Sequence, residues 1–246
     1  MTKASFIIGF QSNRLDNLFQ TIRFLEQRES NLLDLCEIIL VCQDQCQEIR
    51  TKFKHTRLLN LNINEYIRPF MLNTGAYYAN SDIIIILDSD RIMPYNYFNI
   101  SINKLQKRTI ISPKHILKLN TPYSDNDIEH NNIEGMLELR SAIPSLHTKN
   151  VISGNTIIFK DDYYLAGCMD ESFHGYGYSD TDFAMALYSK GFKFILNDNI
   201  EFHLWHPYSN QYKIQNLLNA VKFCNKWNIP LDNELTESIV QYENII

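Results

Sequence analysis

Residues 83–94 read IIIILDSDRIMP: four isoleucines and a leucine run directly into Asp88-Ser89-Asp90. A run this apolar is typical of a strand buried on both faces of a parallel sheet, and the carboxyl end of such a strand lies at the crevice where these folds bind ligands. Carboxylates beside a low-dielectric interior are costly unless they are paired, hydrogen-bonded or bound to a metal. Arg91 is the only basic residue of the stretch, so it is the local candidate partner.

The composition is that of an ordinary globular protein. The chain has 246 residues, of which 45% are hydrophobic and 21% charged, enough for one sizeable α/β core. A formal net charge of -5 argues against a general nucleic-acid or anionic-membrane binder, although it leaves room for a local basic pocket that binds phosphate. We therefore expect no nucleic-acid partner.

The cysteines and the N-terminus indicate a reducing compartment. The five cysteines are odd in number and show no zinc-site spacing, so we expect reduced thiols. The start of the chain lacks the apolar core of a secretory signal, and no run reaches the roughly 18 apolar residues of a membrane span. The sequence predicts cytoplasmic residence without a transmembrane segment; peripheral membrane contact stays open.

Strand-like and helix-like segments alternate along the chain, a pattern that predicts βαβ units. The expected strands are 5–9, 36–42, 57–61, the run ending at Asp88, 109–112, 155–160, 192–195 and 200–205. The expected helices are 14–27, 46–55, 69–80, 94–107, 180–191 and 210–227. We predict an α/β fold in a single domain over 1–246, with a mostly parallel central sheet flanked by helices. Residues 121–147 are polar and weakly patterned, which is typical of a mobile loop or a loosely packed helix.

Three polar segments lie far apart in the sequence: Asp88-Ser89-Asp90, GYGYSDTDF over 175–183, and FHLWHP over 202–207 with His203 and His206. A divalent metal bound to a nucleotide diphosphate would explain the first and the third together. A set of carboxylate and imidazole ligands with open positions suits Mn²⁺ and leaves room for phosphate oxygens.

Each segment also has a simpler interpretation. D-x-D after a strand is common turn chemistry. Ser179-x-x-Asp182 matches a capping box, and a carboxylate in the first helical turn is favoured by the helix dipole. The histidines of H-x-x-H on a strand point to opposite faces unless the chain bends, for which Pro207 offers a reason.

The order of the motifs resembles that of the GT-A glycosyltransferases, in the branch that holds the β-1,4-galactosyltransferases, the chondroitin N-acetylgalactosaminyltransferases and bacterial polysaccharide-synthesising relatives. The matching segments are Arg68-Pro-Phe-Met-Leu-Asn73-Thr-Gly75, Leu87-Asp-Ser-Asp90, Ser153-Gly154-Asn155, Gly175-Tyr-Gly-Tyr-Ser-Asp180-Thr-Asp182 and His203-Leu-Trp-His206. The resemblance implies a Rossmann-like GT-A domain. Its nucleotide and metal half spans about 1–115, its acceptor and catalytic half about 150–210, and a C-terminal helix follows at about 210–227.

The resemblance also implies roles for individual residues. Asp180 would be the catalytic base, and Asp90, His206 and His203 would bind Mn²⁺, with Mg²⁺ as the alternative ion. The donor nucleotide, a UDP-sugar, would contact Phe10, Arg14, Asp44, Arg68, Asn73, Asp88, Ser89 and Gly154. The acceptor, a glycan or glycolipid, would contact Tyr176, Gly177 and Ser179. As in water-excluding transferases, residues 121–147 or the segment after Pro207 would order over the bound donor.

The implied chemistry is inverting transfer. The sugar leaves UDP through a transition state with oxocarbenium character while negative charge develops on the diphosphate, which a metal stabilises. One attack assisted by one base inverts the anomeric centre.

Three positions depart from the family pattern. Ser179 replaces an acidic residue that often orients the acceptor, and Tyr176 replaces a tryptophan while keeping an aromatic platform. The small Val151 favours GalNAc or GlcNAc over galactose in the donor. Two other classes stay open: a nucleotidyltransferase on a similar sheet, and a non-catalytic carbohydrate-binding module.

Overall fold

The computed structural model describes residues 3–47, 49–119, 122, 138–141, 154–207 and 210–231. Its strands are β1 (Ala4–Phe10), β2 (Cys36–Cys42), β3 (His55–Asn60), β4 (Ile83–Leu87), β5 (Arg91–Ile92), β6 (Thr109–Lys118), β7 (Glu138–Ser141), β8 (Asn155–Phe159) and β9 (Lys193–His203). Its helices are α1 (Leu15–Arg28), α2 (Arg68–Tyr78), α3 (Tyr97–Lys104), α5 (Lys160–Ala166), α6 (Ser179–Ser189) and α7 (Asn210–Trp227), with 3₁₀ turns at Ser12–Arg14 and Ser30–Leu32.

All the described strands join one sheet, in the order β3-β2-β1-β4-β8-β6-β9-β5, with β7 paired to β6. Pairing is parallel from β3 through β4 and again between β6 and β9, whereas β8, β7 and β5 pair antiparallel with their neighbours. The predicted α/β fold is confirmed. Parallel pairs join the N-terminal strands and also β6 with β9, and antiparallel pairs join the rest, so the sheet as a whole is mixed. Strand β4 lies between β1 and β8 in the interior, and Ile84 to Leu87 are buried as their composition predicted.

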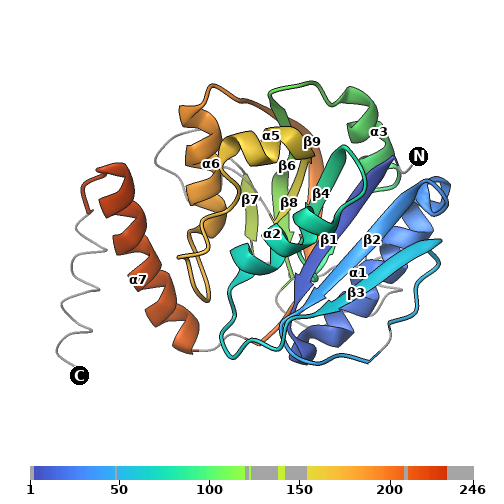
Figure 1. The fold of residues 1–246 in the computed structure, drawn as a ribbon, viewed down its shortest axis with the longest axis horizontal. Helices are drawn as coiled ribbons and strands as arrows, with labels where there is room; N and C mark the ends of the chain where they lie inside the picture. The colour runs from blue at the N-terminus through green and yellow to red at the C-terminus, as the bar shows by residue number, and fades with distance from the viewer. Residues whose placement is uncertain are drawn as a thin grey trace.

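Two layers of helices enclose the sheet (Figure 1). Side chains of a strand alternate between its faces, and β1 shows this: Phe6 and Ile8 join the core cluster beneath α1 and α3, whereas Ile7 joins the cluster beneath α2, α5 and α6. The sheet is therefore covered on both sides, and because a slip of one residue would exchange its faces, this burial fixes the register of its strands.

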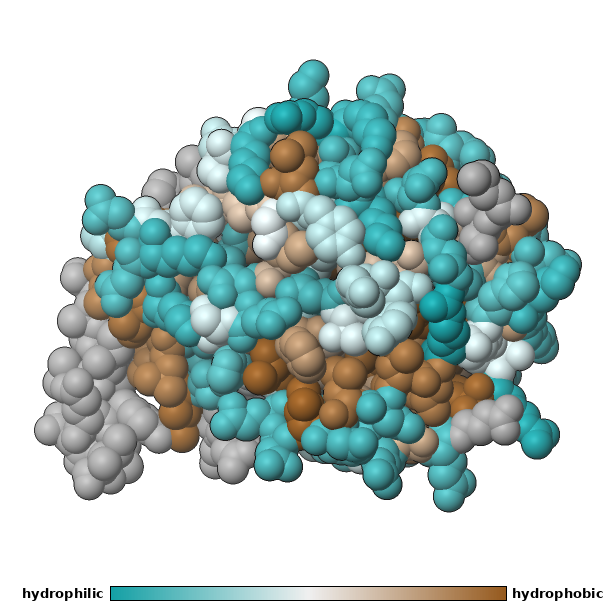
Figure 2. Space-filling model, viewed as in Figure 1, coloured by the Kyte–Doolittle hydropathy of each residue, from teal (hydrophilic) through white to brown (hydrophobic). Residues whose placement is uncertain are grey.

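Helix α7 lies at the left edge of the molecule in Figure 1, beside α6. It packs there through Phe223 and Cys224 on Phe173, with Met185 and Trp227 at the border of the cluster. Figure 2, drawn in the same view, shows polar residues over most of the visible face and apolar residues gathered over β2, β3 and α7. Of the helices that the structure describes, none combines the length and the apolar character that a membrane crossing requires.

Two predicted elements were wrong in detail. The expected helix 46–55 is not formed: its described residues before His55 are irregular, and His55 begins β3. The side chain of Asn60 binds both the backbone N–H and the carbonyl of Cys46, so this carbonyl pairs with a neighbouring strand instead of a helical turn. The two expected strands at 192–195 and 200–205 are one strand, β9, whose pairing with β6 shifts register between Pro113 and His115. Of the stretch 121–147 the structure describes only 122 and 138–141, so the mobile-loop prediction lies outside the described residues.

The segment after Asp90 is fastened to the end of α1. Arg28 donates from Nη1 to the Met93 carbonyl at 2.7 Å, and the Asn96 N–H donates to the Arg28 carbonyl. The Glu29 carboxylate accepts hydrogen bonds from the backbone N–H groups of Phe98 and Asn99, at 2.7 and 3.3 Å. It therefore caps the N-terminus of α3 from a distance, where the N-cap residue Asn96 makes no side-chain hydrogen bond.

The free energy of unfolding is expected to depend on pH through Glu29. Burial raises the pKa of this carboxyl from 4.5 to about 7, so the folded state holds the proton more tightly than the unfolded chain. Its contribution to stability is then present below pH 4.5 and is lost as the pH rises towards 7, at roughly 1 kcal/mol per pH unit. Urea denaturation between pH 4.5 and 7.5 should show a smaller decline for Glu29→Gln than for the wild type. Equal slopes would contradict this, and Asp161→Asn, at an exposed carboxyl of α5, serves as the control.

Candidate active site

The Asp88-Ser89-Asp90 turn follows β4 directly and is held by backbone contacts. The Asp88 N–H donates to the Gly154 carbonyl at 2.7 Å, just before β8 begins, and the Ser89 carbonyl accepts from the Thr21 hydroxyl of α1 at 2.9 Å. These bonds fix the positions of both carboxylates at the end of the central strand. A simple turn would explain these backbone bonds, but it would not explain the direction in which the two carboxylates point.

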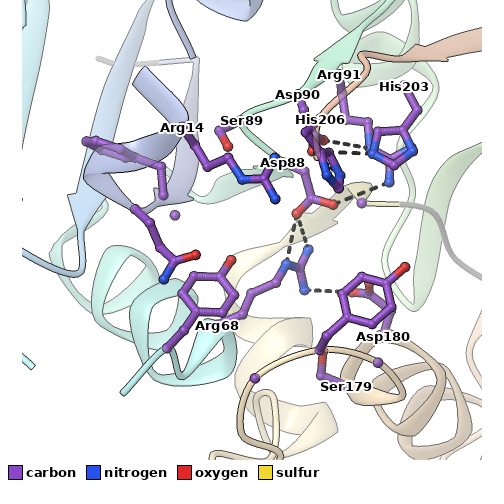
Figure 3. A pocket seen from close by; sticks show the side chains of 18 of the residues that line it. Arg14, Arg68, Asp88, Ser89, Asp90, Arg91, Ser179, Asp180, His203 and His206 are labelled. Atoms are coloured by element: carbon purple, nitrogen blue, oxygen red, sulfur yellow. Dashed lines mark hydrogen bonds and ion pairs between the residues drawn. The ribbon is translucent and has the colours of Figure 1, made fainter. Parts of the chain in front are cut away.

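Asp90 points at both histidines of the H-x-x-H segment. The distances from Asp90 Oδ2 are 3.3 Å to His203 Nε2 and 3.6 Å to His206 Nε2, and one ligand atom from each residue lies within 4.8 Å of the others (Figure 3). Pairing of β5 with β9 sets Arg91 opposite His203, and the Leu204 N–H donates to the Asp90 carbonyl. Strand β9 ends at His203, so the alternation of a strand does not extend to His206, which lies on the same side as His203.

The protonation states of this cluster suit a metal. Burial lowers the pKa of His203 and of His206 below 6.5, so both imidazoles are neutral at pH 7. Burial by itself would raise the pKa of Asp90, but His203 and Arg91 outweigh it and hold that pKa well below its usual range. Neutral imidazoles and an ionised carboxylate are the forms that coordinate metals.

The donor set fits a divalent cation. Asp90 Oδ1 is buried and accepts no hydrogen bond from the described residues, lying 3.3 Å from Arg91 Nε in an ion pair that lacks hydrogen-bond geometry. One carboxylate with two imidazoles leaves coordination positions for phosphate or water oxygens, which suits Mn²⁺. Asp90, His203 and His206 would be the ligands.

Arg68, at the start of α2, joins two carboxylates from distant segments. Its guanidinium lies 2.6 Å from Asp88 Oδ1 through Nη2 and 2.8 Å from Asp180 Oδ1 through Nη1 (Figure 3). Burial raises the pKa of Asp180, and the positive charge of Arg68 offsets part of that increase. Asp180 is the more exposed of the two acids, with 36% of its side chain accessible, so it can meet a ligand while Arg68 stays covered.

Arg91 neutralises part of the negative charge of the Asp88-Ser89-Asp90 turn from the side opposite Arg68. It lies 3.3 Å from Asp90 and 3.6 Å from Asp88, and its Nη1 donates to Glu201 Oε1 at 3.0 Å. Glu201 is completely buried on β9, which holds Arg91 against the turn. Sequence reasoning noted Arg91 but missed Glu201, whose only signal was its position two residues before His203 on one strand face.

A cavity of about 290 Å³ opens over these groups, and we call it the central cavity. Predicted site residues in its wall are Phe10, Arg14, Arg68, Asp88, Ser89, Asp90, Gly154, Tyr176, Gly177, Ser179, Asp180, His203 and His206. The wall also includes residues that were not predicted as site residues, namely Gln11, Tyr66, Lys118, Tyr178 and Asn216. Nearness to the predicted residues Arg14, Arg68 and Asp180 was the sequence signal for Gln11, Tyr66 and Tyr178, whereas Lys118 and Asn216 have no such signal.

Asp44 and Asn73 are not among the described residues of this wall. Asp44 accepts from the Ser12 N–H and hydroxyl at 3.2 and 2.8 Å, which places it at the end of β2 beside the entry to α1. The Asn73 amide donates to the Met169 carbonyl and to Glu171, tying α2 to the turn after α5. Both side chains thus have structural partners outside the cavity wall. Their selection as site residues rested on the motif match alone.

The capping-box interpretation of Ser179 and Asp182 is wrong. Ser179 is the first residue of α6, and the N-cap residue Tyr178 makes no side-chain capping bond. Asp182 is buried and accepts instead from Lys226 Nζ and Trp227 Nε1 of α7, at 2.9 and 2.8 Å. Ser153 and Val151, which the resemblance placed near the donor sugar, lie outside the described residues.

Gly154 is required by the close approach of Asp88. A Cβ atom at this position would lie 1.7 Å from Asp88 Oδ2. We expect Gly154→Ala to displace the carboxylate from Arg68 and to lower the free energy of unfolding by about 1–3 kcal/mol. The clash needs the carboxylate. Adding Gly154→Ala to Asp88→Ala should therefore lower the free energy of unfolding clearly less than Gly154→Ala does in the wild type. Urea denaturation of the four proteins measures this coupling, and additive losses would contradict the steric argument.

Comparison with known proteins gives structural likeness only. No family model and no curated protein matches the sequence. Among solved structures, GalNAc-T7 with UDP, GalNAc and Mn²⁺ superposes with a TM-score of 0.63 at 15% identity, over 90% of this chain and 47% of that one. S. aureus TarS gives 0.58 at 14% identity, over 92% and 40%. Drosophila β1,4-galactosyltransferase 7 with xylobiose gives 0.50 at 14%, over 87% and 79%.

The chain thus spans less than half the length of the first two of these proteins. Its likeness to all three extends over 87–92% of its own length. The expected resemblance is confirmed: the chain has the fold of the GT-A glycosyltransferases.

Proposed function

We propose that the protein is a metal-dependent, inverting glycosyltransferase that moves a sugar from a UDP-sugar to a hydroxyl group of a glycan or glycolipid. The observation that carries this proposal is the convergence of Asp90, His203 and His206 on one wall of the central cavity, with Asp180 also in that wall. The GT-A fold supports it, as does the neighbour solved with UDP and Mn²⁺.

The donor side of the cavity offers groups for a nucleotide diphosphate. Phe10 and Arg14 lie where β1 ends, and Arg14 points towards the Asp88 turn (Figure 3). A guanidinium binds phosphate oxygens through paired hydrogen bonds, so Arg14 would bind the diphosphate, although the chain as a whole is acidic. When bound, Mn²⁺ or Mg²⁺ would stabilise the negative charge of the leaving diphosphate as a Lewis acid.

The acceptor side offers a base and an aromatic surface. Asp180 would accept the proton of the attacking hydroxyl, and its raised pKa makes it a stronger base than an exposed carboxylate. Arg68 would orient that carboxylate through the 2.8 Å contact. Tyr176, 41% exposed in the cavity wall, would pack against a face of the acceptor sugar.

For the donor sugar, we keep the preference for GalNAc or GlcNAc over galactose. It rests on the small Val151, a departure from the family pattern, and GalNAc in the structure of GalNAc-T7 agrees with it. Cytoplasmic synthesis of a polysaccharide is the setting that we propose.

Asp90→Ala should remove the metal site and with it the binding of the nucleotide. We expect the Mn²⁺-dependent affinity for UDP to fall at least ~10²-fold, because a bridging metal contributes several kcal/mol, and we expect turnover to be lost. Titration calorimetry with UDP, with Mn²⁺ or with EDTA, measures the effect. Asp198→Ala, on an exposed carboxylate of β9, is the control. Wild-type UDP affinity in Asp90→Ala would refute the site.

Asp180→Asn should separate catalysis from binding. The amide keeps the shape of the side chain but cannot accept the proton, so turnover should fall at least ~10²-fold while UDP affinity stays within about twofold. The measurement is UDP release alongside calorimetry. Asp161→Asn makes the same change in the first turn of α5, at an exposed position. An equal loss of UDP affinity and turnover in Asp180→Asn would argue against a role as base.

One assay distinguishes the three classes that the sequence left open. The protein is incubated with UDP-GalNAc, UDP-GlcNAc or UDP-galactose and Mn²⁺, and separately with UTP and a sugar phosphate. Release of UDP supports the transferase. Release of pyrophosphate from UTP supports a nucleotidyltransferase, and sugar binding without turnover supports a carbohydrate-binding module; either result overturns the proposal.

A further inference from the structure

Asn219, in the middle of α7, binds the loop that precedes the candidate base. Its Nδ2 donates towards three backbone carbonyl groups, those of His174, Tyr176 and Gly177, at 2.8, 3.0 and 3.0 Å. Its Oδ1 lies 3.4 Å from Gln215 Nε2, which orients the amide. The side chain is 3% exposed, so water does not compete for these contacts.

The loop over 175–178 depends on such contacts because of its backbone. Gly175, Gly177 and Tyr178 all have positive φ, at 65°, 91° and 65°, and the loop belongs to no strand or helix. Its carbonyl groups before Tyr178 therefore lack the regular partners that secondary structure supplies, whereas the Tyr178 carbonyl accepts from the Asp182 N–H of α6. The loop also lies close against α7, since a Cβ on Gly175 would meet Gln215 at 2.4 Å.

A second contact holds the start of α6 from the other side. Lys226 and Trp227, at the end of α7, bind the buried carboxylate of Asp182. Asp180 lies between the two contacts, two residues before Asp182 and two after the loop. Helix α7 thereby fixes the chain on both sides of Asp180, while the Asp180 carboxylate itself pairs with Arg68 of α2.

Helix α7 also contributes directly to the central cavity. Asn216 lies in the cavity wall, one turn before Asn219 on the same face of the helix, and packs against Gly177. Its amide carries both donors and an acceptor, the groups that sugar hydroxyls bind. Tyr176 and Ser179 belong to the same wall, so the amide is close to the groups proposed for the acceptor.

We infer that α7 is a structural part of the acceptor site: Asn219 is a positioning residue that sets the loop over 175–178 and with it Asp180, and Asn216 contacts a neutral sugar ring of the acceptor. The inference rests on the proposed function for its chemistry. The positioning of the loop by Asn219 stands on the hydrogen bonds and can be measured without a substrate.

Amide hydrogen exchange tests the positioning. Asn219→Ala removes the donors, and Asn219→Asp keeps the volume but places an acceptor against three carbonyl oxygens; the alanine variant serves if the aspartate variant does not fold. We expect exchange in peptides covering 174–182 to be at least ~10-fold faster in either variant, with α1 and β4 unchanged. Asn225→Ala, on the exposed side of α7, is the matched control. Wild-type exchange in both Asn219 variants would overturn the inference.

Turnover and UDP affinity test the consequence for Asp180. With UDP-GalNAc and Mn²⁺, and water as the acceptor, turnover by Asn219→Ala should fall about 10-fold or more, because displacements of about 1 Å can cost 10²-fold. UDP affinity by calorimetry should stay within about twofold of the wild type. Equal losses in both would show a general structural role and overturn the inference.

Asn216→Ala tests the acceptor contact with p-nitrophenyl β-N-acetylglucosaminide as the probe. We expect the KM for this acceptor to rise at least ~5-fold, and an unchanged KM would overturn the assignment. Lack of UDP release by the wild type would refute the proposed function instead, and the exchange result would still decide whether Asn219 holds the loop.

Discussion

Charge compensation at the end of β4 is the constraint on which the site depends. Asp88, Asp90 and Asp180 converge on one cavity, and like charges so close in a partly dry environment would repel unless cations lay between them. Arg68 and Arg91 supply those cations, and buried Glu201 keeps Arg91 in place. Asp90 therefore stays ionised, and ion pairs set the positions of all three carboxylates before any ligand arrives. This preorganisation is what a site that must bind a highly charged substrate requires.

The sheet supplies the geometry for this compensation. Strand β4 delivers Asp88 and Asp90 from the interior, β8 brings Gly154 close enough to cover Asp88, and β9 returns along β5 with His203. Two helices place the remaining charged groups in their first turns: Arg68 is the first residue of α2, and Asp180 is the second residue of α6. Each group stands at the end of a rigid element, so its position follows from packing rather than from the loop that carries it.

The sequence predicted the parts of the site that have a local signature. The apolar run before Asp88 identified the buried strand, and motif order placed His203 and His206 beside Asp90 across 113 residues. What it missed depends on contacts that no local pattern encodes. Asn60 binds Cys46 where a helix was expected. The sequence does not show that Glu201 pairs with Arg91. It does not show either that Asn219 binds the backbone carbonyl groups of a loop distant in sequence. Asp44 and Asn73 show the converse: matching a motif did not bring them into the cavity wall.

The pairing of β5 with β9 has a consequence for how the chain can vary. Because Arg91 faces His203 through strand register, the separation of Asp90 from the imidazoles does not depend on how many residues connect them. Insertions in the intervening connections are entropically cheap and leave the ligand distances untouched. A shift of one residue within either strand would instead turn the side chains to the opposite face. Evolution can therefore remodel the surface between these anchors freely, while a single-residue deletion inside β9 would dismantle the centre.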